Sequence, residues 1–259
     1  MKRVLTAALL APPVVFVIFE SHRFLFLAVV GLVAILCFRE FAAMADAHGL
    51  EIEGPLGYAA GVVLLLLPSV DPVVLVLVAM AAMALSIRSG GLSIAMAQSG
   101  AWVLGVIYIF GAWRCAVGLR EINPHWLLFA LALNWVGDIA AYYVGSLTGK
   151  HKLAPRISPG KSWEGSFAGM AASVCFGAIY LGRFLPQVPL FEAVLLTALA
   201  NAAGQLGDLS ESAFKRGAGM KDSGNLLPGH GGWLDRVDSS LFSLPLVYFW
   251  LTRSSMSLN

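Results

Sequence analysis

Charged residues are scarce in this chain. Asp, Glu, Lys and Arg together make up 12% of its 259 residues, whereas they form about a quarter of a typical soluble domain. Hydrophobic residues make up 58%. The shortage of charge excludes an ordinary soluble globular protein, and the sequence therefore predicts an integral membrane protein.

An excess of charge of one sign is also missing, and cysteine is rare. The 17 basic and 15 acidic residues leave a net charge of +2, and the basic residues are clustered, which argues against nucleic acid as a partner. The three cysteines are Cys37, Cys115 and Cys175, and each lies in an apolar run without CxxC spacing. We therefore expect neither a disulfide framework nor a zinc site, and we interpret these cysteines as packing residues.

Hydrophobic runs make up most of the sequence. Nine such segments are separated by short connections; they cover residues 4–19, 24–38, 55–69, 71–87, 97–118, 125–147, 163–182, 189–207 and 237–252. A bilayer core needs about 20 apolar residues for each helical crossing. We predict an all-α polytopic bundle of about nine transmembrane helices in a single membrane domain, 1–259, with N-terminal helices in 1–120 and catalytic helices in 121–259. No small-residue cleavage site follows the first segment, so we interpret it as a membrane helix rather than a signal peptide.

The distribution of Lys and Arg predicts the orientation. With the N-terminus in the cytoplasm, twelve basic residues lie inside and four outside, in agreement with the positive-inside rule. The polar loops 148–162 and 208–236 then face the cytoplasm, where nucleotides are found. Residues 39–54 mix polar and apolar side chains, and we expect them to lie along the membrane interface in a structural role.

The region 208–238 is unusually polar. Possible metal ligands alternate there with possible phosphate-binding cations: Asp208, Asp222, Asp235 and Asp238 with Lys215, Arg216, Lys221 and Arg236. Phosphoryl and nucleotidyl transfer need this combination. Asp208, Glu211, Ser212 and Lys215 recur at spacings of three and four, which places them on one helix face. A solvated helix end is the alternative interpretation.

A glycine-rich loop follows, with six glycines between Gly217 and Gly232. Glycine allows main-chain N–H groups to approach phosphate closely, so Gly231 and Gly232 are candidate substrate-binding residues. His230 contacts phosphate or base, or forms a hydrogen bond within the loop. Asp235 and Asp238 open the last segment and share either a metal site or an ordinary helix-capping role.

Two further polar elements precede this region. Asp138 lies inside the sixth segment on one stripe with Asn134, where a carboxylate is costly; it is a site candidate or an interhelical hydrogen-bonding group. Ser158 and Pro159 predict a helix start, which would place Lys161, Ser162 and Glu164 at an anion-binding N-terminus. The alternative is a purely structural helix start.

The residues from Ser212 to Asp238 carry a resemblance. Their pattern, SAFKR, four residues, KD, and then PGHGGWLDRVD, resembles the signature of the phosphatidate cytidylyltransferases, or CDP-diacylglycerol synthases, with the spacing intact. Trp233 stands where that family more often has an aliphatic residue. The segment SPGKSWEG at 158–165 and the helix of Asp138 are also similar, so the resemblance covers roughly 134–240.

The resemblance implies an inner-membrane homodimer that joins CTP and phosphatidate into CDP-diacylglycerol and pyrophosphate with Mg²⁺. It implies Asp208 and Asp235 as the principal metal ligands, with a second cation left open. The phosphatidate oxygen is already an anionic nucleophile, so the reaction needs charge neutralisation and alignment rather than a nucleophilic side chain. A CTP-dependent polyprenol kinase and an ion-coupled transporter are the alternatives.

Overall fold

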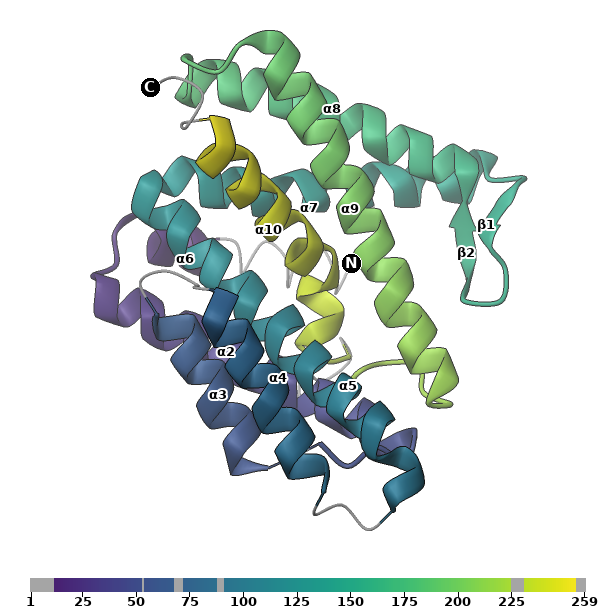
Figure 1. Cartoon of the computed structure of the whole chain (residues 1–259). Helices are drawn as coiled ribbons and strands as arrows, with labels where there is room; N and C mark the ends of the chain where they lie inside the picture. Colours follow the sequence, from purple (N-terminus) through teal and green to yellow (C-terminus); the bar gives the residue numbers. More distant parts are fainter. Residues whose placement is uncertain (1–11, 53, 68–71, 88–90, 225–230, 255–259) are drawn as a thin grey trace. The chain divides into compact units, whose positions relative to one another are not determined.

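The computed structural model describes residues 12–52, 54–67, 72–87, 91–224 and 231–254. The predicted all-α fold is confirmed (Figure 1). After a helical stretch at 12–19, the α-helices are α2 (Arg23–Ala47), α3 (Pro55–Leu66), α4 (Pro72–Ser86), α5 (Ala95–Gly105), α6 (Ala112–Ile122), α7 (Pro124–Thr148), α8 (Trp163–Phe184), α9 (Leu190–Gly217) and α10 (Leu234–Ser254). A 3-10 turn, η1 (Leu92–Ile94), precedes α5, and a π-helical stretch, η2 (Val106–Gly111), joins α5 to α6.

Several helices have the length and composition of membrane spans. Five of those in the described ranges qualify: α2, the continuous stretch Leu92–Ile122, α7, α8 and α9. The helices α3 and α4 are apolar but shorter. A membrane protein is therefore supported, whereas the number of nine crossings stays a prediction.

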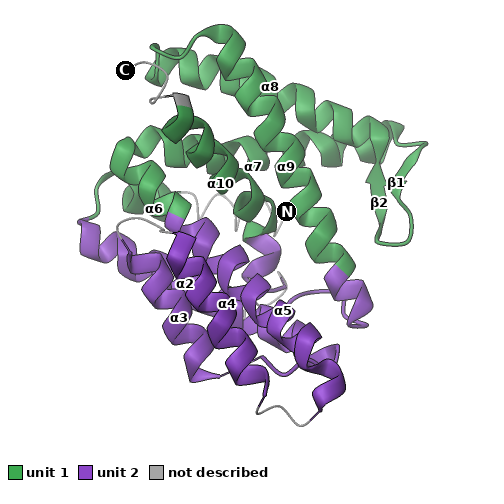
Figure 2. Ribbon diagram, viewed as in Figure 1, with its two compact units in different colours: residues 1–21, 115–213, 237–259 green, residues 22–114, 214–236 purple. Residues whose placement is uncertain are grey.

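The chain divides into two compact units (Figure 2). Unit 1 comprises residues 1–21, 115–213 and 237–259, and unit 2 comprises 22–114 and 214–236. The polar region 208–238 is thus shared between them, because α9 and α10 each run from one unit into the other. The glycine-rich loop belongs with the N-terminal helices rather than with α7 and α8.

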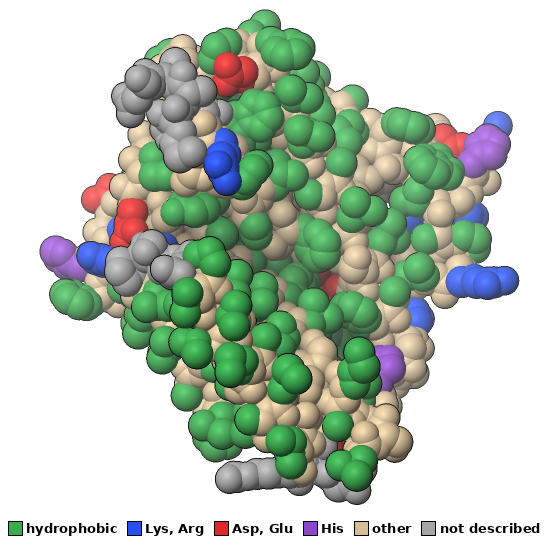
Figure 3. All heavy atoms as spheres, viewed as in Figure 1, with side chains coloured by type: hydrophobic (Ala, Val, Ile, Leu, Met, Phe, Trp, Pro, Cys, Tyr) green, Lys and Arg blue, Asp and Glu red, His purple; other side chains and the backbone are tan. Residues whose placement is uncertain are grey.

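The face of the molecule in Figure 3 is rich in hydrophobic side chains. Large apolar residues lie exposed on helices of both units, among them Phe24, Met96, Ile179 and Phe191, which are 74% to 90% exposed. Water would make such exposure unfavourable, whereas lipid tails solvate it. This surface agrees with a protein embedded in a bilayer.

Unit 2 is built around α2. Phe38 is fully buried and packs against Phe110, with ring centroids 5.5 Å apart. The first part of 39–54 continues α2 through Ala47 and buries Phe41 and Glu40, whereas the interfacial position of the segment stays a prediction. The helix does not stop at the charged pair Arg39 and Glu40, since hydrogen bonds to Glu40 described below compensate for burying the carboxylate.

Unit 1 places α7 and α8 side by side through small residues. A Cβ atom at Gly165 would lie 2.8 Å from the carbonyl oxygen of Ala141, and one at Gly169 would lie 2.8 Å from that of Gly137. Such glycines allow membrane helices to approach closely. Polar bonds link each of the two helices to a further helix, since Asn134 of α7 donates to Ser243 of α10 at 2.8 Å and Asn201 of α9 donates to Ser173 of α8 at 2.9 Å.

The close approach of α7 and α8 predicts a selective stability effect. Gly169→Ala should destabilise the protein by about 1–3 kcal/mol, because the new methyl group overlaps backbone that cannot move away cheaply. Gly182→Ala on the same helix is the matched control, since a Cβ there meets nothing within 4 Å. Thermal unfolding in detergent measures both variants, and equal midpoints for the two would contradict this packing account.

The predicted helix start at Ser158 and Pro159 is wrong. These residues open β2 (Ser158–Ser162), which pairs antiparallel with β1 (Lys152–Ala154), and α8 begins only at Trp163. Ser162 is the N-cap, and its Oγ accepts a hydrogen bond from the N–H of Gly165 at 3.2 Å. The hairpin keeps the chain extended as far as Ser162, which caps the helix as well as Ser158 would.

Candidate active site

A cavity of about 480 Å³ lies within unit 1. It is bounded by α7, the β-hairpin, α8 and α9, and its wall consists of Gly137, Asp138, Ala141, Tyr142, Gly145, Ser146, Leu153, Ser158, Gly160, Lys161, Ser162, Gly165, Ser166, Asn201, Gln205 and Asp208. Five residues predicted from the sequence meet here: Asp138, Ser158, Lys161, Ser162 and Asp208. Three segments distant in the sequence therefore contribute to one polar cavity.

Lys161 and Asp208 form an ion pair on the cavity wall. Their side chains are 28% and 27% exposed, so both charged groups remain open to a ligand. Ser212, one turn further along α9, donates a long hydrogen bond of 3.4 Å to Oδ1 of Asp208. The pair offers a cation for phosphate and an oxygen donor for a metal at the same place.

Asp138 faces the same cavity. The interhelical hydrogen bonds near it are made by Asn134, Ser173 and Asn201. Ser166 and Gln205 are hydrogen-bonded to each other and add neutral polar groups to the wall. Sequence inspection missed both, although Gln205 lies one turn before Asp208 on the face that the spacing rule already indicated.

Glu164 has a different environment from the one predicted. Its carboxylate accepts hydrogen bonds from His151, from the main-chain N–H at 3.2 Å and from Nδ1 at 2.7 Å. These bonds tie the start of α8 to the β-hairpin that carries Lys161. Glu164 thus supports the hairpin, and a direct role in substrate binding stays a prediction.

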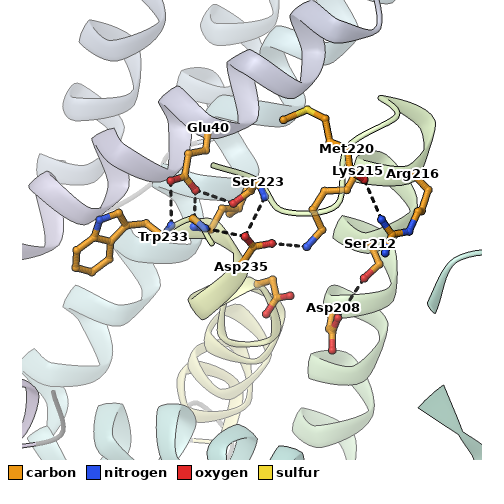
Figure 4. A network of polar contacts seen from close by, with 12 residues as sticks. Glu40, Asp208, Ser212, Lys215, Arg216, Met220, Ser223, Trp233 and Asp235 are labelled. Atoms are coloured by element: carbon orange, nitrogen blue, oxygen red, sulfur yellow. Dashed lines mark hydrogen bonds and ion pairs between the residues drawn. The ribbon is translucent and has the colours of Figure 1, made fainter. Parts of the chain in front are cut away.

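Asp235 is the centre of a second cluster, in unit 2 (Figure 4). Its Oδ1 is paired with Lys215, and its Oδ2 accepts the main-chain N–H groups of Ser223 at 2.9 Å and Gly232 at 2.8 Å. Burial alone would raise the pKa of Asp235, but the Lys215 ammonium and these N–H groups lower it below the ordinary value of 3.8. The carboxylate is therefore ionised above that pH, and its stabilising contacts are lost only as pH falls through the lowered pKa.

Other predicted residues lie around these clusters. Arg216 donates to the carbonyl oxygen of Met220 at 2.9 Å, and Lys221, Asp222 and Arg236 have exposed side chains. Gly231 has φ +76°, a conformation that favours glycine, and its approach to phosphate stays a prediction. In unit 1, Oδ1 of Asp238 accepts a hydrogen bond from the N–H of Ser239 at 2.6 Å. His230 lies outside the described residues.

Sequence analysis missed Glu40 as a site residue. This carboxylate of α2 accepts hydrogen bonds from the Ser223 hydroxyl at 2.8 Å and from the main-chain N–H groups of Trp233 at 3.0 Å and Leu234 at 2.9 Å (Figure 4). An acidic residue within an apolar helix was the available signal. The interpretation of 39–54 as an interfacial segment obscured it.

The donor chemistry fits a magnesium ion that is completed by substrate. Among the residues with described positions, no group of three or more His, Cys, Asp or Glu side chains could hold a metal by itself. Mg²⁺ commonly takes one or two carboxylates and fills its other positions with water and phosphate oxygens. Asp208 and Asp235 each offer one carboxylate, which suits that incomplete protein shell, and a metal would take the place of the lysine with which each is paired in this structure.

The fold and these clusters define a class: a helical membrane protein whose polar sites combine carboxylates, lysines and a glycine-rich turn. A sequence model of the Cytidylyltransferase family matches residues 1–253, and the chain belongs to that family. The resemblance noted from Ser212 to Asp238 is thereby confirmed.

Relatives agree with this assignment. The chain is 42% identical over 156 residues to the phosphatidate cytidylyltransferase of Bacillus subtilis, which is 59% of this chain and 58% of that protein. It is 40% identical over 151 residues to the enzyme of the same name from Staphylococcus saprophyticus, or 58% of each chain, and 42% identical over 154 residues to that of Staphylococcus aureus, or 59% and 58%. The alignment thus spans less than two thirds of the length of these relatives.

Proposed function

We propose that this protein transfers the cytidylyl group of CTP to phosphatidate, giving CDP-diacylglycerol and pyrophosphate. Family membership and the names of the relatives support a cytidylyltransferase. The structural observation that carries the proposal is the cavity where Lys161 pairs with Asp208, between helices apolar enough to cross a membrane. A lipid phosphate and a nucleotide both need such a polar site beside a bilayer.

The reaction exchanges one phosphorus–oxygen bond for another. An oxygen of the phosphatidate phosphate attacks the α-phosphorus of CTP, the bond from that phosphorus to the oxygen bridging to the β-phosphorus breaks, and pyrophosphate leaves with the electron pair. No side-chain nucleophile is needed because the attacking oxygen is already anionic. The protein must bring two anions together, so cationic side chains and alignment supply the catalysis.

Each cluster has a role in this scheme. Lys161 and Ser162 bind phosphate oxygens in the cavity of unit 1, and Asp138 belongs to the same polar wall. Lys215, Arg216, Lys221 and Arg236 offset the charge of the phosphatidate and the departing pyrophosphate, with the main chain of the glycine-rich loop as a further donor. The acyl chains remain among the apolar helices while the headgroup reaches the cavity.

The metal, the location and the assembly are parts of the proposal. Asp208 and Asp235 would hold Mg²⁺, which supplies charge neutralisation to the triphosphate; a second cation stays an open alternative. The fit of two lysine-paired carboxylates to an incomplete magnesium shell supports this assignment. The distribution of basic residues supports an active site on the cytoplasmic side, and the bacterial relatives support a bacterial inner membrane. We further propose a homodimer, as the family resemblance implies.

A radiolabel assay tests the function directly. Purified protein in detergent is given CTP labelled at the α-phosphate together with phosphatidate, and lipid-linked cytidine is measured. The expected product is labelled lipid that requires both substrates and a divalent cation. Undecaprenol with CTP labelled at the γ-phosphate is the second arm, and label in undecaprenyl phosphate, without lipid-linked cytidine, would favour the polyprenol kinase and refute the proposal.

Lys161→Ala should weaken substrate capture. Loss of one charge-assisted contact to phosphate is expected to raise the KM by roughly 10- to 100-fold. Lys152→Ala is the matched control, because Lys152 lies on the same hairpin with an exposed side chain. Steady-state kinetics with both substrates measures the effect, and an unchanged KM would return Lys161 to a structural role.

A further inference from the structure

Glu40 lies in an unusual place for an acidic residue. It belongs to α2, one of the helices with the composition of a membrane span, and it is only 4% exposed. Burying a carboxylate is expensive unless its oxygens are hydrogen-bonded. The buried Glu40 carboxylate therefore needs hydrogen-bond donors around it.

Its partners come from two separated points of the chain. Ser223 precedes residues 224–232, the part of the glycine-rich loop that we call the glycine-rich turn, and Trp233 and Leu234 follow it at the start of α10. Glu40 thus joins the two ends of that turn. Asp235 binds the same two ends from its own side, through the N–H groups of Ser223 and Gly232 (Figure 4).

Two glycines leave room for the Glu40 carboxylate. A Cβ atom at Gly224 would lie 2.7 Å from Oε1 of Glu40, and one at Gly232 would lie 2.3 Å from Oε2. Real Cβ atoms do not approach an oxygen so closely, so any larger residue at either position would displace the carboxylate or the turn. These glycines flank Glu40 independently of its hydrogen bonds, and they indicate a turn shaped around this side chain.

We propose that Glu40 is a positioning residue for the transfer reaction. By holding Ser223 and the start of α10 together, it fixes the main chain that orients Asp235 and the glycine-rich turn. This inference rests on the proposed function and extends it, because it gives an N-terminal helix a part in the site. Glu40 acts through Asp235 and does not touch substrate.

The hydrogen-bond pattern requires a carboxylate rather than an amide. Oε1 accepts from the N–H of Trp233, and Oε2 accepts from the N–H of Leu234 and the hydroxyl of Ser223. A glutamine has the same shape, but whichever way it is turned its NH₂ group faces a main-chain N–H that cannot accept. Glu40→Gln should therefore lose one of the two main-chain hydrogen bonds at the start of α10 without leaving a cavity.

Hydrogen–deuterium exchange of the full-length protein tests whether Glu40 holds the glycine-rich turn in place. In Glu40→Gln, peptides covering 231–236 should exchange about tenfold faster, because a main-chain hydrogen bond is lost. Exchange in α7 and α8 should stay unchanged. Glu20→Gln, at an exposed position, is the matched control. This measurement needs no substrate, so it remains informative even if the radiolabel assay refutes the proposed function.

Steady-state kinetics tests whether Glu40 affects the transfer reaction. We expect kcat to fall by roughly 10- to 100-fold in Glu40→Gln with the KM for CTP within about threefold of the parent, since misplaced catalytic groups slow the reaction more than they weaken binding. Ser223→Ala, which leaves both main-chain bonds to Glu40, should show a smaller fall and carries the test if Glu40→Gln does not fold. Unchanged exchange at 231–236, or faster exchange with unchanged kcat, would overturn the inference.

Discussion

Asp208→Asn is expected to lower formation of CDP-diacylglycerol by at least about 100-fold, with folding retained. Removing a single charge-stabilising group from an active site has an effect of this size. Asparagine keeps the shape of the side chain but loses the negative charge, so it binds Mg²⁺ poorly. Steady-state turnover over a range of Mg²⁺ concentrations measures the effect, and thermal unfolding verifies the fold.

Two controls give this result its meaning. Asp46→Asn makes the same chemical change at an exposed position and should leave turnover unchanged. The double variant Asp208→Asn with Lys161→Ala tests whether the loss comes only from leaving Lys161 without its carboxylate. At saturating substrate we expect the kcat of the double variant to stay as low as that of Asp208→Asn, and a kcat equal to that of Lys161→Ala alone would show that Asp208 serves the lysine rather than a metal.

Asp235→Asn should cause a loss of at least similar size, for a compound reason. Oδ2 accepts two main-chain N–H groups while Oδ1 is paired with Lys215. The asparagine oxygen can keep either the N–H groups or the lysine, and its NH₂ group opposes the other. Both a proposed metal ligand and the shape of the turn are therefore damaged, and turnover should fall by roughly 100- to 1000-fold.

The two aspartate variants should also differ in a property that does not depend on turnover, namely the rate of deuterium exchange. Asp235→Asn is expected to accelerate deuterium exchange at 231–236, whereas Asp208→Asn should leave those peptides protected, because Asp208 contacts Lys161 and Ser212 instead. Full turnover of Asp235→Asn would refute its role in catalysis. Equal exchange in the two variants would refute the account of Asp235 as the centre of the turn.

The polar residues of the site were largely predictable from the sequence. A carboxylate or lysine is rare in this apolar chain, so Asp138, Lys161, Asp208 and Asp235 were visible against the background. Helical spacing also placed Asp208 and Ser212 on one face correctly, since they are in contact one turn apart. The start of α8 was missed because Ser158 and Ser162 cap equally well, and only the pairing of β1 with β2 chooses between them.

The sequence by itself determined that this protein lies in a membrane, because composition decides whether a chain dissolves in lipid. It also determined the chemistry of the site, because charged groups persist in lipid only where they have a partner. Only the tertiary structure decided which groups meet. Lys161 faces Asp208 across 47 residues of sequence, and Glu40 reaches the glycine-rich turn from a helix about 190 residues away. Such pairings depend on helix packing and on hydrogen bonds to main-chain N–H groups, which leave no pattern in the order of the side chains.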